Sequence, residues 1–571
     1  MSDHPSLVLR GGIIVDGTGG APYEADVAIN DGKITAIGTQ LPRGAEEIDA
    51  RGKIVTPGFI DVHTHYDAQV TWSSQITPSS WNGVTTTMIG NCGVGFAPCL
   101  PHQRDMLVKL MEGVEDIPEV VLTTGLPWNW ESFGDYLNTL AARPYDLDVV
   151  TQVPHAALRV FVMGRRGADR EPATAEDRAR MAALAAEGIR AGALGFSTSR
   201  TINHKTKAGE SIPTLGAPEE ELAEIYAAVG ATNAGWLQVI SDFDDPDAEF
   251  AMLRRLAKNS GRPMTMTILQ RDAKPDEWRH ILAHIAAANA DGLRMTGQVI
   301  GRPTGIMLGF EISQNPFLGR PSFDAINHLS FDEKLKILRD PAFRAKLIAE
   351  PNLNPGLQKR CATWERIFAL GDKPNYEPAP EQSIAAIAAR TGRKPEDVAY
   401  DMLLENGGKT ILYRPLSNYT HGDLEDVREM ITHSNTLIGL GDGGAHVGIL
   451  SDASSITYLL THWTRDRTRG PKMPLEWAIK RLTRDNAAAI GLLDRGLVRV
   501  GCKADINVID YDRLQLRPPQ VMYDLPSGGR RLVQRTDGYT ATLVAGVPVY
   551  REGEATGALP GKLVRGAQAP A

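Results

Sequence analysis

Pro57-Gly58-Phe59-Ile60-Asp61-Val62-His63-Thr64-His65-Tyr66-Asp67 is the stretch that decides the fold. Its apolar run, entered through Pro-Gly, predicts a buried strand that ends in two histidines one residue apart. Residues i and i+2 of a strand point to the same face, so His63 and His65 can reach one metal ion. Asp61 shares that face one step deeper. The alternative is a histidine pair in a polar loop.

Beyond this stretch, short apolar segments alternate with helical patterns. We expect eight strands, at residues 58–63, 84–90, 147–153, 192–198, 235–241, 262–269, 293–300 and 436–442. Eight strand-helix units predict an α/β fold, a (β/α)8 TIM barrel over residues 56–494. Two stretches, near 99–146 and 301–380, look like insertions. Loops that follow barrel strands lie on the catalytic face, so a cap or lid is expected there.

The two ends of the chain have a different pattern, in which apolar and polar residues alternate between Gly-rich turns. Asp26 to Ile34 carries a hairpin signal, and similar strands return near the end, for example in 541–550. We predict one β-sandwich built from residues 1–55 and 495–554, because neither terminal fragment would have a hydrophobic core alone. Residues 555–571 are expected to form a C-terminal tail or a surface wrap.

Composition excludes several classes of protein. The net charge of −8 is not the positive charge typical of proteins that bind nucleic acid, and no apolar run is long enough to span a membrane. Four cysteines in 571 residues do not make a disulfide framework. We therefore expect a cytoplasmic protein that binds neither nucleic acid nor membrane.

Two further residues fall at ends of predicted strands. Cys92 follows the second strand, between Asn91 and Gly93, and faces the end of the first strand. Asp442 follows the eighth strand in Gly441-Asp442-Gly443-Gly444 and can approach the histidine pair, because strands one and eight of a barrel are neighbours. Asp442 can serve as a ligand and as a proton acceptor. The alternatives are a small buried cysteine and a plain Asp-Gly-Gly turn.

These residues, with Thr56 to Asp61 and Gly501-Cys502-Lys503-Ala504-Asp505-Ile506, resemble the amidohydrolase superfamily. Gly83 to Gly93 is similar to the N-acyl-D-amino-acid deacylase (D-aminoacylase) group, in which a cysteine replaces a carboxylated lysine. Gly192 to Thr198 looks like that group's fourth strand. The resemblance covers residues 7 to 550 and implies a barrel with a β-sandwich that hydrolyses an amide bond with metal-activated water.

The sequence departs from that group at the fifth and sixth strands, where the family has a histidine on each for the more tightly held zinc. Gln238, Asp242 and Gln270 lie there instead. The His-Pro-Arg stretch that follows the strand-eight aspartate in the family, with an arginine for the substrate carboxylate, is replaced by Gly444-Ala445-His446. Amides or peptides without a free carboxylate therefore become plausible substrates.

The remaining donor set suits one Zn²⁺ rather than two, and consists of His63, His65, Cys92 and Asp442. A catalytic zinc keeps an open position, so either the site takes five ligands, or Cys92 or Asp442 stays off the metal. His204 and His446 are candidate replacement ligands or substrate contacts, as are Gln238 and Gln270 for substrate. His155, after the third strand, could polarise the scissile carbonyl. For His155, His204 and His446 a purely structural role is the alternative.

The expected function is a metal-dependent amidohydrolase of the deacylase type that cleaves a C–N amide bond other than a peptide bond, with Asp442 as general base. Its partner would be a small-molecule amide, an N-acyl-D-amino acid or a related compound. A cyclic-amide hydrolase, or a non-catalytic ligand-binding barrel that has lost its tight metal site, is the alternative. The resemblance also suggests a homo-oligomer.

Overall fold

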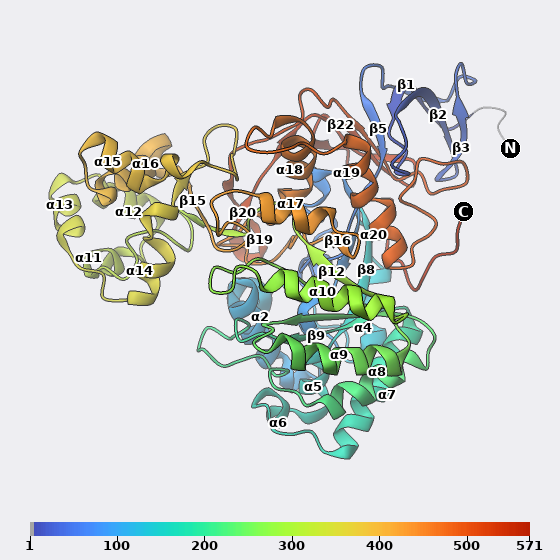
Figure 1. Ribbon diagram of the computed structural model, residues 1–571, viewed down its shortest axis with the longest axis horizontal. Coiled ribbons are helices and arrows are strands. Elements are labelled where there is room, and N and C mark those ends of the chain that lie inside the picture. The colour runs from blue at the N-terminus through green and yellow to red at the C-terminus, as the bar shows by residue number, and fades with distance from the viewer. Residues whose placement is uncertain (1–4) are drawn as a thin grey trace.

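The computed structural model describes residues 5–571, and its centre is an eight-stranded parallel barrel (Figure 1). The strands, in spatial order, are β6 (Phe59–Asp61), β7 (Val84–Ile89), β8 (Asp148–Pro154), β9 (Gly195–Arg200), β10 (Trp236–Ser241), β11 (Met264–Thr267), β12 (Met295–Val299) and β16 (Thr436–Ile438). All eight predicted strands are present. Strands β7 and β8 are buried along their whole length, as expected of parallel strands covered on both faces. The predicted barrel is confirmed.

The barrel closes where its first strand, β6, meets its last, β16, and we call this junction the barrel seam. A parallel bridge joins His63 to Leu440, just beyond the ends of β6 and β16. One level below, the buried side chain of Asn486 donates hydrogen bonds of 2.8 Å to the carbonyls of Ile60 and Ile438. Asn486 lies in α20 (Arg484–Ala489), so a helix outside the barrel stabilises the contact between the first and last strands.

Helices surround the strands, and α7 (Ala175–Ala191) and α9 (Pro246–Ser260) each begin after a residue whose side chain accepts a capping hydrogen bond. Helix α7 starts after Thr174, whose hydroxyl accepts from the backbone N–H of Asp177, and its buried face includes Met181 and Ile189. The other main barrel helices are α5 (His155–Met163), α8 (Glu219–Gly230), α10 (Glu277–Ala290), α17 (Glu425–Thr432) and α19 (Leu475–Leu482).

Two excursions leave the barrel after strands. The first, between β7 and β8, contains α2 (Arg104–Glu115), α3 (Glu119–Gly125) and α4 (Phe133–Ala141). The second projects as a helical lobe with a hydrophobic core of its own, and Figure 1 shows it at the left. The lobe contains β13 (Gly305–Leu308), α11 (Pro321–Ile326), α12 (Phe331–Leu338), α13 (Pro341–Ala349), α14 (Pro355–Cys361), β14 (Phe368–Ala369), α15 (Ile384–Thr391), α16 (Pro395–Gly408) and β15 (Leu412–Pro415).

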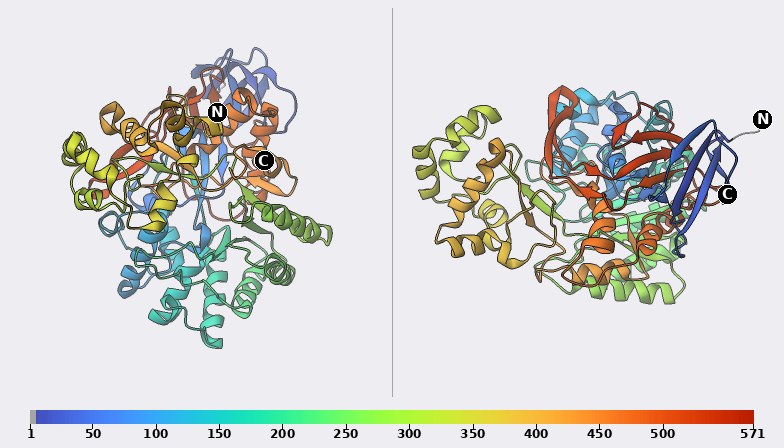
Figure 2. Two further views of the ribbon diagram at one scale, coloured as in Figure 1. Left: turned by 60° about the vertical axis from the view of Figure 1, so that its left-hand side comes forward. Right: turned by 90° about the horizontal axis from the view of Figure 1, so that it is seen from above.

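Strands from both termini form one nine-stranded mixed sheet around a separate core (Figure 2). Its strands are β1 (Leu7–Ile14), β2 (Tyr23–Asn30), β3 (Lys33–Gly38), β4 (Glu46–Asp49), β5 (Ile54–Pro57), β17 (Ile506–Ile509), β22 (Tyr539–Val544), β23 (Val547–Arg551) and β24 (Glu554–Ala555). Strand β5 pairs with both β1 and β17, so the two halves are hydrogen-bonded directly. Residues 1–4 of the predicted N-terminal segment lie outside the described residues.

A hairpin that the sequence analysis did not separate from this sheet returns to the barrel. It consists of β19 (Gln520–Leu525) and β20 (Gly529–Val533). Arg531 donates to the carbonyl of Thr77 at 2.7 Å, and the backbone N–H of Leu532 donates to the carbonyl of Val447 at 2.7 Å. Val447 follows the eighth strand, so the hairpin supports the loop that carries Asp442.

The last residues wrap around the base of the barrel. Gly561 and Leu563 form bridges with Tyr145 and Val149. Beside them the fully buried Asp148 carboxylate contacts Arg495 at 2.6 Å and Lys503 at 2.7 Å. Because a buried carboxylate needs such partners, this network ties the terminal sheet to β8. Among residues 5–571, no helix is long and apolar enough to cross a membrane.

We expect Asn486→Ala to lower the free energy of unfolding by about 2 kcal/mol, because it removes two buried hydrogen bonds at the barrel seam. Denaturant unfolding monitored by circular dichroism measures the change. Asn138→Ala, at an exposed position of α4, is the control and should change stability little. Equal stability of the two variants would contradict a role for Asn486 in closing the barrel.

Candidate metal centre

The two histidines after β6 converge with Cys92 at the mouth of the barrel. The Nε2 atom of His63 lies 3.2 Å from the Sγ of Cys92, and the ligand atoms of His63, His65 and Cys92 lie within 4.8 Å of one another. Oδ1 of Asp442 lies 3.4 Å from Nε2 of His65 and 3.7 Å from Nε2 of His63. The structure therefore brings together all four residues that the sequence proposed as ligands.

Asp442 reaches the cluster because the barrel seam continues past the last strand. Its backbone N–H donates to the carbonyl of His63 at 2.9 Å, and the N–H of His65 donates to the carbonyl of Gly443 at 2.8 Å. Asp442 itself has a left-handed φ of 50°. Gly441 is needed for close approach, since a Cβ there would lie 1.9 Å from Oδ2 of Asp61.

Asp61 supports this backbone from below rather than joining the ligands. One of its oxygens, Oδ1, accepts 3.2 Å hydrogen bonds from the N–H groups of both His63 and Gly441. Burial raises the pKa of Asp61 to about 7, although those two bonds oppose the rise. The carboxyl group thus holds the first and last strand ends together.

The charges of the cluster stabilise one another. Burial alone would raise the pKa of Asp442, but His65 and His63 more than offset it and hold this pKa below its usual range. Burial likewise opposes ionisation of Cys92, yet the same histidines lower the pKa of its thiol. Only Asp442 is appreciably exposed, with 22% of its side chain accessible. The cluster is therefore open to solvent on the Asp442 side.

Two residues that the sequence analysis missed orient the histidine rings. Nδ1 of His63 lies 2.5 Å from Oε1 of Gln298, and Nδ1 of His65 lies 3.1 Å from Oε1 of Glu115. Gln298 is a hydrogen-bonding partner of His63, and the Glu115 carboxylate is a charged partner beside Nδ1 of His65, so both rings present Nε2 to the cluster. Gln298 could have been found, since it lies near the end of the seventh predicted strand. Glu115 gave no such signal, because it ends helix α2 inside an insertion.

Two of the three residues at the positions of the missing histidines, Gln238 and Gln270, have neutral side chains, and the third, Asp242, accepts hydrogen bonds from Thr201 and Ile202. Gln238, on β10, accepts a 2.9 Å hydrogen bond from the backbone N–H of Cys92, so it positions the cysteine. Gln270 belongs to a different network: its side chain donates to Asp426 and accepts from the N–H of Thr420. The structure does not bring Gln270 to the cluster through these contacts, and its role toward substrate stays a prediction.

His204 and His446 lie close enough to the cluster to affect its electrostatics. Burial, and then the nearby His446 and His65, lower the pKa of His204 to about 3, so its imidazole is neutral at pH 7. Its Nδ1 lies 2.9 Å from the hydroxyl of Ser199. His446 in turn contributes to lowering the pKa of Asp442. Both residues thus belong to the surroundings of the site.

His155 lies among polar side chains from neighbouring elements. Its Nδ1 lies 2.8 Å from Oγ1 of Thr198, and its Nε2 lies 2.9 Å from Oε1 of Glu221, which also contacts Arg159. The side chain is fully buried. Polar side chains thus lie beside both ring nitrogens of His155, and its role in polarising a substrate carbonyl stays a prediction.

The donor set fits a zinc ion. Two imidazole nitrogens, a thiolate and a carboxylate are ligands that Zn²⁺ takes in tetrahedral sites. Two more buried carboxyl groups, Glu115 and Asp61, surround them, and each has one oxygen without a hydrogen-bond partner among residues 5–571. A cation at the cluster would compensate this concentration of buried acidic groups.

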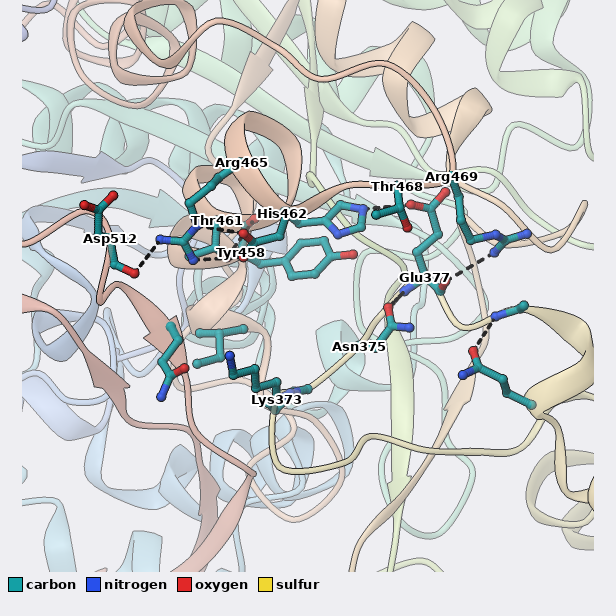
Figure 3. Close-up of a pocket in the computed structure, with 16 residues that line it drawn as sticks. Lys373, Asn375, Glu377, Tyr458, Thr461, His462, Arg465, Thr468, Arg469 and Asp512 are labelled. Carbon is teal, nitrogen blue, oxygen red and sulfur yellow. Dashed lines mark hydrogen bonds and ion pairs between the residues drawn. The ribbon is translucent and has the colours of Figure 1, made fainter.

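A cavity of about 570 Å³ lies elsewhere, between residues 373–382, which connect β14 to α15, and the helix Leu459–Asp466 (Figure 3). On its wall, Glu377 contacts His462 at 2.7 Å and the buried Arg467 at 3.0 Å. These partners overcome the effect of burial and lower the pKa of Glu377 to about 2. The cavity shares no lining residue with the metal cluster, and its buried carboxylate, Glu377, is paired with His462 and Arg467.

A closed parallel barrel with histidine, cysteine and aspartate ligands at its strand ends defines a class of metal-binding barrel enzymes. The chain belongs to the Amidohydrolase family, whose sequence profile matches residues 46–550. This confirms the recognised superfamily and the prediction of a hydrolase that acts on carbon–nitrogen bonds other than peptide bonds.

Several proteins resemble the chain over nearly its whole length. The D-aminoacylase of Alcaligenes xylosoxydans xylosoxydans is 27% identical, with 98% of this chain and 97% of that protein covered. A D-aminoacylase structure with a binuclear metal centre, for which one-metal activation and second-metal attenuation are described, has a TM-score of 0.64 at 23% identity, with 98% and 99% covered. The N-acyl-D-glutamate deacylase of Bordetella bronchiseptica, solved with zinc and a phosphonate inhibitor, has a TM-score of 0.64 at 23% identity, with 99% and 100% covered.

We expect Gly441→Ala to lose most of its bound zinc, because the added Cβ would collide with Asp61 and displace the Asp442 loop. Metal analysis of the purified variant after dialysis against zinc measures the loss. Gly134→Ala, in helix α4 where an added Cβ makes only ordinary contact, is the control and should retain the wild-type content. Full zinc occupancy in folded Gly441→Ala would contradict the tight packing of Asp442 against Asp61.

We expect Glu115→Gln to weaken zinc binding by about 10- to 100-fold, because His65 would lose the charged partner at its Nδ1 atom. Competition with a chromophoric chelator measures the affinity. Glu112→Gln, one turn earlier on the same helix and paired with Lys207 at the surface, is the matched control. An affinity equal to that of the control would show that Glu115 does not support the ligand.

Proposed function

We propose that this protein is a zinc-dependent amidohydrolase that cleaves the amide bond of an N-acyl-D-amino acid or a related amide. The observation that carries the proposal is the convergence of His63, His65, Cys92 and Asp442 at the closed seam of the barrel. The relatives named D-aminoacylase and N-acyl-D-glutamate deacylase support the substrate class. The non-catalytic alternative is not retained, because no observation favours it.

The mouth of the barrel offers one compact set of ligands, so we propose one catalytic zinc ion there. His63, His65 and Cys92 would hold it, with Asp442 completing the set and a fifth position left for water. When bound, the zinc would polarise the amide carbonyl and lower the pKa of water. Gln238 takes the place of one histidine of the relatives' tighter site and is bonded to Cys92, which supports a single ion at the histidine pair.

Asp442 is the proposed general base. Its depressed pKa keeps it ionised at neutral pH, and it is the one member of the cluster with appreciable exposure to solvent. It can therefore accept a proton from the attacking water and return it to the leaving nitrogen. Asp61 and the seam hydrogen bonds hold its backbone, so that little reorganisation is needed during the reaction.

The residues around the candidate ligands also affect which substrates can bind. His446 lies in the stretch where the family resemblance places an arginine for the substrate carboxylate, and the nearby His204 is neutral at pH 7. A neutral imidazole can donate to or accept from an amide without requiring a negative charge. We propose that a substrate whose carboxylate is capped as an amide is accepted as well as the free acid.

We expect the zinc-loaded enzyme to hydrolyse N-acetyl-D-methionine and N-acetyl-D-methioninamide, with Asp442→Asn about 10²- to 10⁴-fold slower. Release of the free amine measures turnover, and the L-isomers test chirality. Asp105→Asn, exposed on α2, is the control and should match the wild type. Turnover that survives both zinc removal and Asp442→Asn would contradict the proposed function, and a strong preference for the free acid would contradict the proposed substrate range.

A further inference from the structure

Three potential metal ligands converge on the outer surface of the barrel, far along the chain from the catalytic cluster. His280 and His284 lie one turn apart on α10, and Asp247 lies in the first turn of α9. Oδ1 of Asp247 is 2.9 Å from Nε2 of His280 and 2.8 Å from Nε2 of His284, and the two nitrogens are 3.0 Å apart. Figure 1 shows α9 and α10 side by side.

The separations are close to those of a coordinated ion. Tetrahedral zinc with bonds of about 2.0–2.1 Å places its ligand atoms about 3.3 Å from one another. The observed spacings of 2.8 to 3.0 Å therefore need only a small outward movement of exposed side chains. Histidines at positions i and i+4 of a helix are a known way to offer two nitrogens to one metal.

The arrangement of hydrogen-bond donors and acceptors among Asp247, His280 and His284 also favours a bound cation. Two neutral imidazoles that both donated to Asp247 would bring two N–H protons together across a nitrogen separation of 3.0 Å. One metal ion in place of those protons satisfies both nitrogen lone pairs and the carboxylate. Because only one oxygen of Asp247 contacts the rings, the geometry resembles monodentate ligation.

Neighbouring groups hold part of the site in place before binding. The ring of His284 is stacked on Phe250 of α9, with centroids 4.8 Å apart and planes at 11°. Asp247 follows Pro246, the first residue of α9, which restricts the backbone there. His284 and Asp247 also line a surface cavity of about 640 Å³, which leaves room for water as a further ligand.

We propose that Asp247, His280 and His284 form a second metal site for a transition-metal ion of the zinc class, separate from catalysis. The site joins helices that follow two neighbouring barrel strands, β10 and β11, and so it clamps α9 to α10. The bound ion stabilises the folded state, because its three ligands come together only when the two helices pack.

Equilibrium dialysis against zinc chloride at pH 7.5, with metal analysis of the full-length protein, tests the site. We expect the wild type to bind one more zinc per chain than either His280→Gln or His284→Gln, or to bind that zinc at least about tenfold more tightly. Zinc should also raise the thermal unfolding midpoint of the wild type more than that of either variant. His421→Gln, an exposed histidine that contacts Asp426, is the matched control and should behave as the wild type does.

Cobalt distinguishes the two centres. Cobalt at the catalytic cluster gives a thiolate charge-transfer band through Cys92, and this band should be unchanged in His280→Gln and His284→Gln. Loss of one zinc equivalent with this band retained supports the surface site, even if the protein hydrolyses none of the amides tested. Identical zinc number, zinc affinity and unfolding midpoint shift in the wild type and both folded variants would overturn the proposal.

Discussion

Closure between the first and last barrel strands is the constraint on which the candidate active site depends. Gly441 packs against Asp61, Asp61 accepts from the backbone of both strand ends, and Asp442 donates its N–H to the carbonyl of His63. The same contacts that complete the barrel place a carboxylate beside two imidazoles. The contacts that close the barrel are therefore the contacts that position the candidate ligands. Asn486 stabilises the same junction from outside the barrel.

Around the ligands, the protein distributes support over distant parts of the chain. Gln298 comes from the seventh strand, Glu115 from a helix of the first insertion, and Gln238 from the fifth strand. The hairpin β19–β20 adds backbone support to the loop after Asp442 through Val447. Each ligand is thus oriented by a group outside its own element, which is the arrangement that fixes ring orientation and limits movement at a metal site.

The sequence predicted the barrel well because buried parallel strands are short, continuous apolar runs, and all eight were found. It also placed His63, His65, Cys92 and Asp442, since strand-end residues share one rim of a barrel. Glu115 was missed because its position depends on how an insertion folds back, which local pattern does not encode. His155 follows a strand as expected, but Glu221 of a neighbouring helix binds its ring, and such a contact is visible only in three dimensions.

The seam has a further consequence for how the protein is made. Asp61 and Gly441 are separated by 380 residues, and the hairpin and the C-terminal wrap lie later still. On the ribosome, His63, His65 and Cys92 emerge long before Asp442, so the first part of the chain carries an incomplete set of ligands while the rest is synthesised. Only the nearly finished polypeptide can close the barrel, so the candidate set of ligands is completed only after the eighth strand has been synthesised.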